Sequence, residues 1–277
     1  MRRLLPASIL LIAALTAACS GGPAPLTVVA NAPGTFDVGK PQRLLVGIVD
    51  AETAEFLASP DLDATAVLVA PDMSERQVPT EFLWTVPDRV GIYLIRETFD
   101  QDGTWWVKLR PQGMTESMQA SFVVGNDDPM PGVGEPAVSI ETRTTADHPL
   151  DEISSDPDPD PSFYELSLDE ALTNGQPTVV VFASPAFCTS QTCGPMLDQV
   201  EAVASQHPGV NYLHVEIYEN LDAASPADLL VSEAVTAWGL PSEPWVFVID
   251  RDGRVSSRFE GALGDGEIEE ALAAVGA

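Results

Sequence analysis

The chain has 277 residues, of which 42 are acidic and 13 are basic, so its formal net charge is −29. This length predicts about two domains of roughly 150 residues each, and a hydrophobic content of 45% is enough for real cores. Nucleic acids and anionic lipid surfaces are polyanions, so the charge argues against either of them as a partner. The three cysteines, Cys19, Cys188 and Cys193, are an odd number, which needs an explanation in a secreted chain.

Residues 1–18 have the pattern of a secretory signal peptide: the basic sequence MRR, a mostly apolar stretch and three small residues. The apolar stretch is too short for a permanent membrane span. The next residue, Cys19, makes the segment resemble a bacterial lipobox, although Thr16 stands where the lipobox usually has leucine. The resemblance implies a lipoprotein with a lipidated Cys19 and a tether at 19–25, anchored at the extracytoplasmic face of the bacterial cell membrane. The alternative is an ordinary cleaved signal that leaves a free thiol.

Residues 26–125 read as short strands between turn signals. The runs of strand-forming residues are 26–31, 42–49, 64–69, 80–86, 91–98, 104–109 and 119–124. About seven strands at this spacing predict an all-β immunoglobulin-like sandwich of ~100 residues. Asp102-Gly103 is a hairpin signal between two of the runs. Trp105 and Trp106 point to opposite faces of one strand, so only one of them belongs to the core.

Residues 126–161 are rich in proline and aspartate and end in the sequence DPDPDP. Alternating Asp and Pro favours an extended, stiff linker. A calcium site from Asp156, Asp158 and Asp160 is the alternative, but proline removes the turn that such a loop needs.

Helices and strands alternate from residue 162 to residue 277. Ser167 and Glu170 form a capping box at the start of the first helix. The elements that follow are a strand at 178–184, a helix at 195–206, a strand at 210–217, a helix at 226–238, strands at 245–249 and 254–259, and a helix at 265–275. This order predicts an α/β domain.

Two segments of this C-terminal part carry a family resemblance. The sequence TVVVFASPAFCTSQTCGP, which begins at Thr178, places a buried strand before a cysteine loop and a helix start, and WGLPSEPWVFVIDRDG places Pro244 directly before a strand. With these segments the chain resembles the extracytoplasmic thioredoxin-like proteins of the TlpA type. The resemblance implies a thioredoxin fold with a redox disulfide between Cys188 and Cys193. It also implies a cis peptide bond before Pro244, which docks the substrate backbone, and Phe187 in the place of the family's tryptophan.

Several residues depart from the thioredoxin pattern. Four residues rather than two separate the cysteines, and Val180 and Val181 stand where many thioredoxins bury an acid. The sequence CTSQTC is also similar to atypical two-cysteine peroxiredoxins of the bacterioferritin-comigratory type. That family places an arginine where this chain has Pro244, and a peroxidase without the cation loses a main source of transition-state stabilisation.

These observations favour a thiol–disulfide oxidoreductase that acts on extracytoplasmic protein thiols or disulfides through a mixed disulfide. A helix N-terminus lowers the pKa of a nearby thiol, which favours Cys193 as the activated group, whereas its place in the chain favours Cys188 as the attacking thiol. The alternatives are a non-catalytic thioredoxin-fold binding module with a structural disulfide and a thiol peroxidase.

No cofactor and no metal site is expected. A copper chaperone would need a C-x3-C spacing and a partnered histidine. Met114 and Met118 are soft donors that suit Cu(I), but no histidine or cysteine accompanies them in the N-terminal domain, so we expect them to fill gaps in the core.

Overall fold

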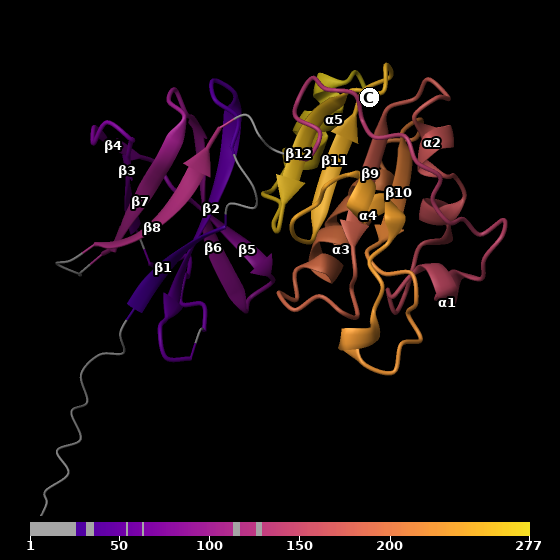
Figure 1. Ribbon diagram of the computed structural model, residues 1–277, viewed down its shortest axis with the longest axis horizontal. Coiled ribbons are helices and arrows are strands. Elements are labelled where there is room, and N and C mark those ends of the chain that lie inside the picture. Colours follow the sequence, from indigo (N-terminus) through magenta and orange to yellow (C-terminus); the bar gives the residue numbers. More distant parts are fainter. Residues whose placement is uncertain (1–25, 32–35, 54, 63, 113–116, 126–128) are drawn as a thin grey trace, which may run out of the picture.

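A computed structural model describes residues 26–31, 36–53, 55–62, 64–112, 117–125 and 129–277 of the chain (Figure 1). The predicted signal peptide at 1–18, the lipidation site Cys19 and the tether at 19–25 lie outside these ranges. No helix within them is both long enough and apolar enough to cross a membrane. Three four-stranded sheets organise the described chain, two in its N-terminal half and one in its C-terminal half.

The N-terminal half is a β-sandwich whose strand pairs are all antiparallel. One sheet has the order β1 (Leu26–Asn31), β2 (Pro41–Asp50), β6 (Val90–Thr98) and β5 (Glu81–Val86). The other has the order β4 (Glu75–Val78), β3 (Ala64–Val69), β7 (Gly103–Pro111) and β8 (Met118–Val124). The seven predicted strands are all present, and β4 is an eighth that the sequence did not indicate.

The sandwich core supports an immunoglobulin-like fold, as predicted. Alternate side chains of both sheets meet in one cluster, where the ring of Phe99 lies 5.2 Å from the ring centroids of Trp105 and Phe122. Trp105 is fully buried and Trp106 on the opposite face of β7 is half-buried. The predicted hairpin at Asp102-Gly103 is wrong, because the flanking strands β6 and β7 belong to different sheets.

The C-terminal sheet is mixed. Its order is β10 (Asn211–Glu216), β9 (Thr178–Ala183), β11 (Trp245–Ile249) and β12 (Val255–Glu260). β9 and β10 are parallel, whereas β11 is antiparallel to both β9 and β12. All six residues of β9 and all five of β11 are buried, because both faces of the sheet are covered.

Helices of very different lengths cover the two faces. α3 (Cys193–Ala204) and α5 (Glu267–Ala274) pack on the face that carries Val179 and Val181. The one-turn helices α2 (Leu168–Ala171) and α4 (Glu233–Ala237) pack on the other face. The remaining helical segments are α1 (Leu150–Ile153) and the 3-10 turns η1 (Pro161–Tyr164) and η2 (Pro226–Asp228).

The prediction of a C-terminal α/β thioredoxin fold is wrong, as the proportions of strand and helix show. The protein is mostly β, with 36% strand and 17% helix in three sheets, and no α/β thioredoxin fold is evident. The largest difference is the helix predicted at 226–238, where η2 and the five-residue α4 flank a segment whose Val231 forms a β-bridge with Tyr218. The spacing of apolar residues indicated that this segment packs on the sheet, but such spacing does not determine how many helical turns form.

The proline-rich segment expected as an extended linker packs against the C-terminal sheet from residue 129 onward. Ala137 donates its backbone N–H to the carbonyl of Gly253 at 2.9 Å, and the Trp238 indole donates to the carbonyl of Val138 at 3.1 Å. Asp160 caps η1 by accepting from the backbone N–H of Ser162. These contacts make the segment a part of the C-terminal half.

The sandwich lies against the β12 edge of the C-terminal sheet (Figure 1). Arg43 of β2 reaches Glu267 of α5 and donates to the carbonyl of Ala262 at 2.8 Å. A small apolar cluster spans the same boundary and consists of Leu45, Leu83, Ile92, Leu94 and Ala262. Residues of the predicted cysteine loop line a cleft beside this boundary.

Candidate functional site

Cys188 and Cys193 form a disulfide in the loop between β9 and α3, with their Cα atoms 6.1 Å apart. β9 is entirely buried and ends directly before the loop, where Ser184 accepts the backbone N–H of Cys188 at 2.9 Å. Cys188 is 9% exposed and Cys193 is fully buried. The predicted cysteine pair is therefore present, and Cys188 is the sulfur that a partner reaches more easily.

Polar contacts hold the disulfide loop in one conformation. The Cys188 sulfur lies 3.1 Å from the Ser190 hydroxyl, which lies 2.8 Å from the hydroxyl of Thr192. Gln191 has a φ of 61°, which closes the loop tightly before Cys193 begins α3. The partial positive charge of the helix N-terminus therefore falls on the buried sulfur.

Pro244 follows a cis peptide bond, as predicted. It stands directly before β11, and its carbonyl accepts the backbone N–H of Gly261 at 3.0 Å. Trp245, the next residue, pairs with Phe182 of β9, so the chain at Pro244 lies next to the strand that leads into the cysteine loop. The role of Pro244 in holding a substrate backbone stays a prediction.

Glu243 is a site residue that sequence reasoning missed. One of its carboxylate oxygens and the sulfurs of Cys188 and Cys193 all lie within 4.8 Å of one another. Burial raises the pKa of Glu243 to about 7, and the negative charge of Glu216 adds to the increase. Its place directly before Pro244 was the available signal, since residues next to that proline are brought to the disulfide.

Phe187 is half-buried beside Cys188, and its ring packs edge-on against Tyr218 with the centroids 6.0 Å apart. The predicted contact of Phe187 with a substrate stays a prediction. Tyr218 lies just after the end of β10, the strand next to β9. The aromatic pair therefore connects one side of the cysteine loop to the end of β10.

A cavity of about 660 Å³ lies between the cysteine loop and the sandwich. The C-terminal half contributes the loop residues 189–192 together with Ser242 and Glu243, and the sandwich contributes Arg89 and a set of apolar side chains. These apolar side chains are Val29, Leu45, Phe56, Val90 and Ile92. A volume of this size suits a small ligand or a few side chains of a polypeptide.

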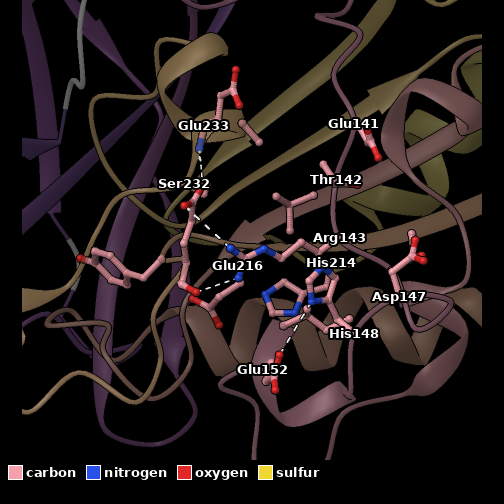
Figure 2. A pocket seen from close by; sticks show the side chains of 16 residues that line it. Glu141, Thr142, Arg143, Asp147, His148, Glu152, His214, Glu216, Ser232 and Glu233 are labelled. Atoms are coloured by element: carbon pink, nitrogen blue, oxygen red, sulfur yellow. Dashed lines mark hydrogen bonds and ion pairs between the residues drawn. The ribbon is translucent and has the colours of Figure 1, made fainter.

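A second, polar pocket of about 300 Å³ lies at the carboxyl end of β10 and contains His214 and Glu216 (Figure 2). His214 has both ring nitrogens occupied, with Nδ1 2.6 Å from the Tyr164 hydroxyl and Nε2 3.0 Å from the Ala183 carbonyl. Burial lowers the pKa of His214, which leaves a neutral ring that joins β10 to the end of β9.

Glu216 connects this polar pocket to the disulfide site. Its carboxylate accepts the backbone N–H groups of Ser155 at 2.8 Å and Ile217 at 3.0 Å, which hold it in place. After burial, the charge of Glu216 is the second cause of the raised pKa of Glu243.

The methionines and aspartates that the sequence analysis weighed and rejected as metal ligands make structural contacts where they are described. Met118 packs against the sandwich core, and Met114 lies outside the described residues. Asp156 accepts the backbone N–H of Asp158 at 3.0 Å, while Asp160 caps η1.

No protein-family model matches the chain, and no curated protein matches it. Among solved structures, the chain is similar to the crystal structure of the Lin-41 filamin domain, with a TM-score of 0.25 and 14% sequence identity. The similarity covers 36% of this chain and 91% of that chain. Of the predicted family resemblance, the structure shows a cysteine pair at disulfide distance in a sheet-rich fold. No family match confirms a thioredoxin-like protein.

Proposed function

We propose that this protein is a thiol–disulfide oxidoreductase that exchanges through the Cys188–Cys193 pair. The observation that carries the proposal is the place of the disulfide, which lies at the N-terminus of α3 and closes a loop whose residues 189–192 line a cleft. The resemblance of the two sequence segments to thioredoxin-like oxidoreductases supports the same chemistry, independently of the fold.

Accessibility and helix position assign different roles to the two sulfurs. Cys188 is the less buried of the two cysteines, so an incoming thiolate attacks its sulfur and forms the mixed disulfide. Cys193 leaves as a thiolate at the start of α3, where the helix N-terminus stabilises the negative charge. In the opposite direction Cys188 is the attacking thiol and Cys193 resolves the mixed disulfide.

A structural contribution of this disulfide is expected to be modest. The cysteines are five positions apart, and closing a loop of this length removes chain entropy worth roughly 2 kcal/mol in the chain-entropy formula. A bridge that joined distant elements would contribute more. This difference favours a redox role over a purely structural one.

The proposal includes the place where the protein works. The basic, apolar and small-residue pattern before Cys19 supports a lipid anchor at the extracytoplasmic face of a bacterial membrane, where disulfides persist. Protein thiols or disulfides of that compartment are the proposed partners. A Cys19→Ala variant is then expected to lose labelling by a fatty acid in cells and to leave the membrane fraction.

Turnover tests the oxidoreductase itself. The protein should accelerate the reduction of a disulfide-linked peptide by dithiothreitol, and Cys188→Ser should abolish the acceleration. A wild-type rate no higher than that of the Cys188→Ser/Cys193→Ser double variant would indicate a structural disulfide instead.

A further inference from the structure

Glu243 presents a buried polar group that simple exchange between the two sulfurs does not use. Its Oε2 atom is inaccessible to solvent and has no hydrogen-bond partner among the described residues. A carboxylate oxygen of the same residue lies within 4.8 Å of the sulfurs of both Cys188 and Cys193. A buried carboxylate oxygen without a donor is costly unless the group takes up a proton.

The charges around Glu243 favour its protonated form. Burial is the larger cause of its raised pKa, and Glu216 at the end of β10 is the second. Tyr218 is electrostatically coupled to Glu243, since burial first and then the charge of Glu243 raise the pKa of Tyr218. The other charged groups around the cleft are Arg89, Glu55 and Glu260, and Glu260 accepts a hydrogen bond from Ser242 at 2.8 Å.

We propose that Glu243 is the acid–base group of the Cys188–Cys193 pair and carries a proton to and from Cys193 as the disulfide opens and closes. The proposal rests on the proposed exchange function and adds a residue from the cis-proline segment to it. The location of Glu243 suits the task, because Cys193 is fully buried and water does not reach its sulfur.

The reduction of the pair by a substrate dithiol balances as follows. One substrate thiolate attacks the Cys188 sulfur, the Cys188–Cys193 bond breaks, and its electron pair goes to the Cys193 sulfur. Protonated Glu243 then donates its proton to the Cys193 thiolate. The second substrate thiol loses its proton to Glu243, attacks the sulfur of the mixed disulfide and expels Cys188 as a thiolate, which takes that proton. Glu243 is then a carboxylate, and it takes up from the solvent the proton that the first substrate thiol released when it became a thiolate. Two electrons and two protons thus pass from the dithiol to the pair, and Glu243 returns to its protonated state.

Two negative charges at this distance are unfavourable, so Glu243 and the Cys193 thiol titrate as a coupled pair. Glu243→Gln removes the acid and one of the charges. The apparent pKa of the thiol should therefore fall, while opening of the disulfide by a dithiol should slow by about 100-fold at pH 6, the lower end of what general acid–base catalysis contributes.

The experiment uses the full chain and two measurements across pH 5–9. Thiolate absorbance of the reduced protein gives the pKa of the thiols, and stopped-flow mixing of the oxidised protein with dithiothreitol gives the opening rate. Glu243→Asp keeps the acid and should restore part of the rate at pH 6. Glu270→Gln removes an exposed charge on α5 and should change neither curve.

Each outcome separates the two proposals. If wild type opens with dithiothreitol and Glu243→Gln reproduces both wild-type curves, the acid–base role is wrong and the exchange function stands. If the wild-type pair resists reduction across the range, the exchange function itself is wrong. If Glu243→Gln does not fold, the Glu243→Asp profile decides, because an unchanged rate and thiol pKa in that variant would overturn the proposal.

Discussion

Arg43 of β2 and Glu267 of α5 form a two-pronged ion pair between the sandwich and the C-terminal half. Arg43 Nε lies 2.9 Å from Oε1, and Nη2 lies 2.7 Å from Oε2. Both side chains are largely buried, with exposed fractions of 15% and 7%. The Arg43 guanidinium also lies 5.2 Å from the Phe259 ring centroid. The pair therefore joins the sandwich to the C-terminal half. The cleft that the cysteine loop lines lies beside this boundary.

Arg43→Ala should destabilise the protein by about 3 kcal/mol, because it leaves the buried Glu267 carboxylate with Arg96 as its single cationic partner, beside the backbone N–H of Gly264. Arg96 still lies 2.8 Å from Oε1, which keeps the loss at the lower end for a broken buried pair. Arg96→Ala is the matched control, since Arg96 is 45% exposed and its loss should cost about 1 kcal/mol. Urea unfolding measures both, and equal effects would contradict the importance of the two-pronged pair.

Cys193→Ser should trap a mixed disulfide on Cys188. The remaining Cys188 is the less buried cysteine of the pair, and once it has attacked glutathione disulfide its former partner is no longer a thiol that could resolve the adduct. Mass spectrometry should show one glutathione on Cys193→Ser and little or none on Cys188→Ser, whose remaining sulfur is fully buried. The reverse preference would make Cys193 the attacking thiol, as its helix position alone suggested.

The free energy of unfolding should depend on pH through Glu201 of α3. Burial raises the pKa of Glu201 to about 7, with Asp156 the second cause, and its Oε1 atom has no hydrogen-bond partner among the described residues. In the unfolded chain a glutamate has a pKa of about 4.3. The folded state therefore binds more protons between these values, and this contribution lowers the free energy of unfolding as pH rises from about 4.3 to about 7.

Glu201→Gln should flatten that part of the curve and stabilise the protein at pH 8 relative to wild type. Glu270→Gln, which removes an exposed charge, should leave the slope unchanged. Urea unfolding at pH 4.5, 6 and 8 checks this, and parallel curves for wild type and Glu201→Gln would show that Glu201 titrates alike in both states.

The two adjacent tryptophans of β7 should differ strongly in their contribution to stability. Trp105 is fully buried and donates its indole N–H to the carbonyl of Gln101 at 3.0 Å, so Trp105→Ala should cost about 3–5 kcal/mol. Trp106 is half-buried, so Trp106→Ala should cost roughly half as much or less. Thermal unfolding compares the two variants, and a larger loss at Trp106 would contradict the register of β7.

Strand positions were the part of the fold that alternation and turns could predict. β1 and β3 begin and end where the pattern of β-branched residues indicated. β4 was missed because its sequence ERQV is polar and lies at a sheet edge, where one face needs no burial. The number of helical turns was the part that local pattern could not predict, because tertiary packing decides how far a short helix extends. For this reason the sequence pattern overestimated the helix content, and the predicted α/β thioredoxin fold was wrong.

In the candidate site too, residues within short sequence motifs could be predicted, whereas residues that only the fold brings together could not. Cys188, Cys193 and Pro244 could be predicted because each stands in a short sequence segment with a recognisable pattern. Glu243 was missed although it stands next to Pro244, since its role depends on a distance to sulfurs 50 and 55 positions earlier in the chain, measured only in the fold. The cleft was equally hidden, because half of its wall comes from the sandwich.

The midpoint potential of the Cys188–Cys193 pair is the decisive test of the proposed oxidoreductase function. The full chain is equilibrated with mixtures of reduced and oxidised glutathione, and free thiols are alkylated and counted by mass spectrometry. An exchange catalyst should show a midpoint above roughly −270 mV, within the span of known catalysts of this kind. A midpoint below roughly −300 mV would mean a structural bridge that resists the glutathione pool, and it would contradict the oxidoreductase function.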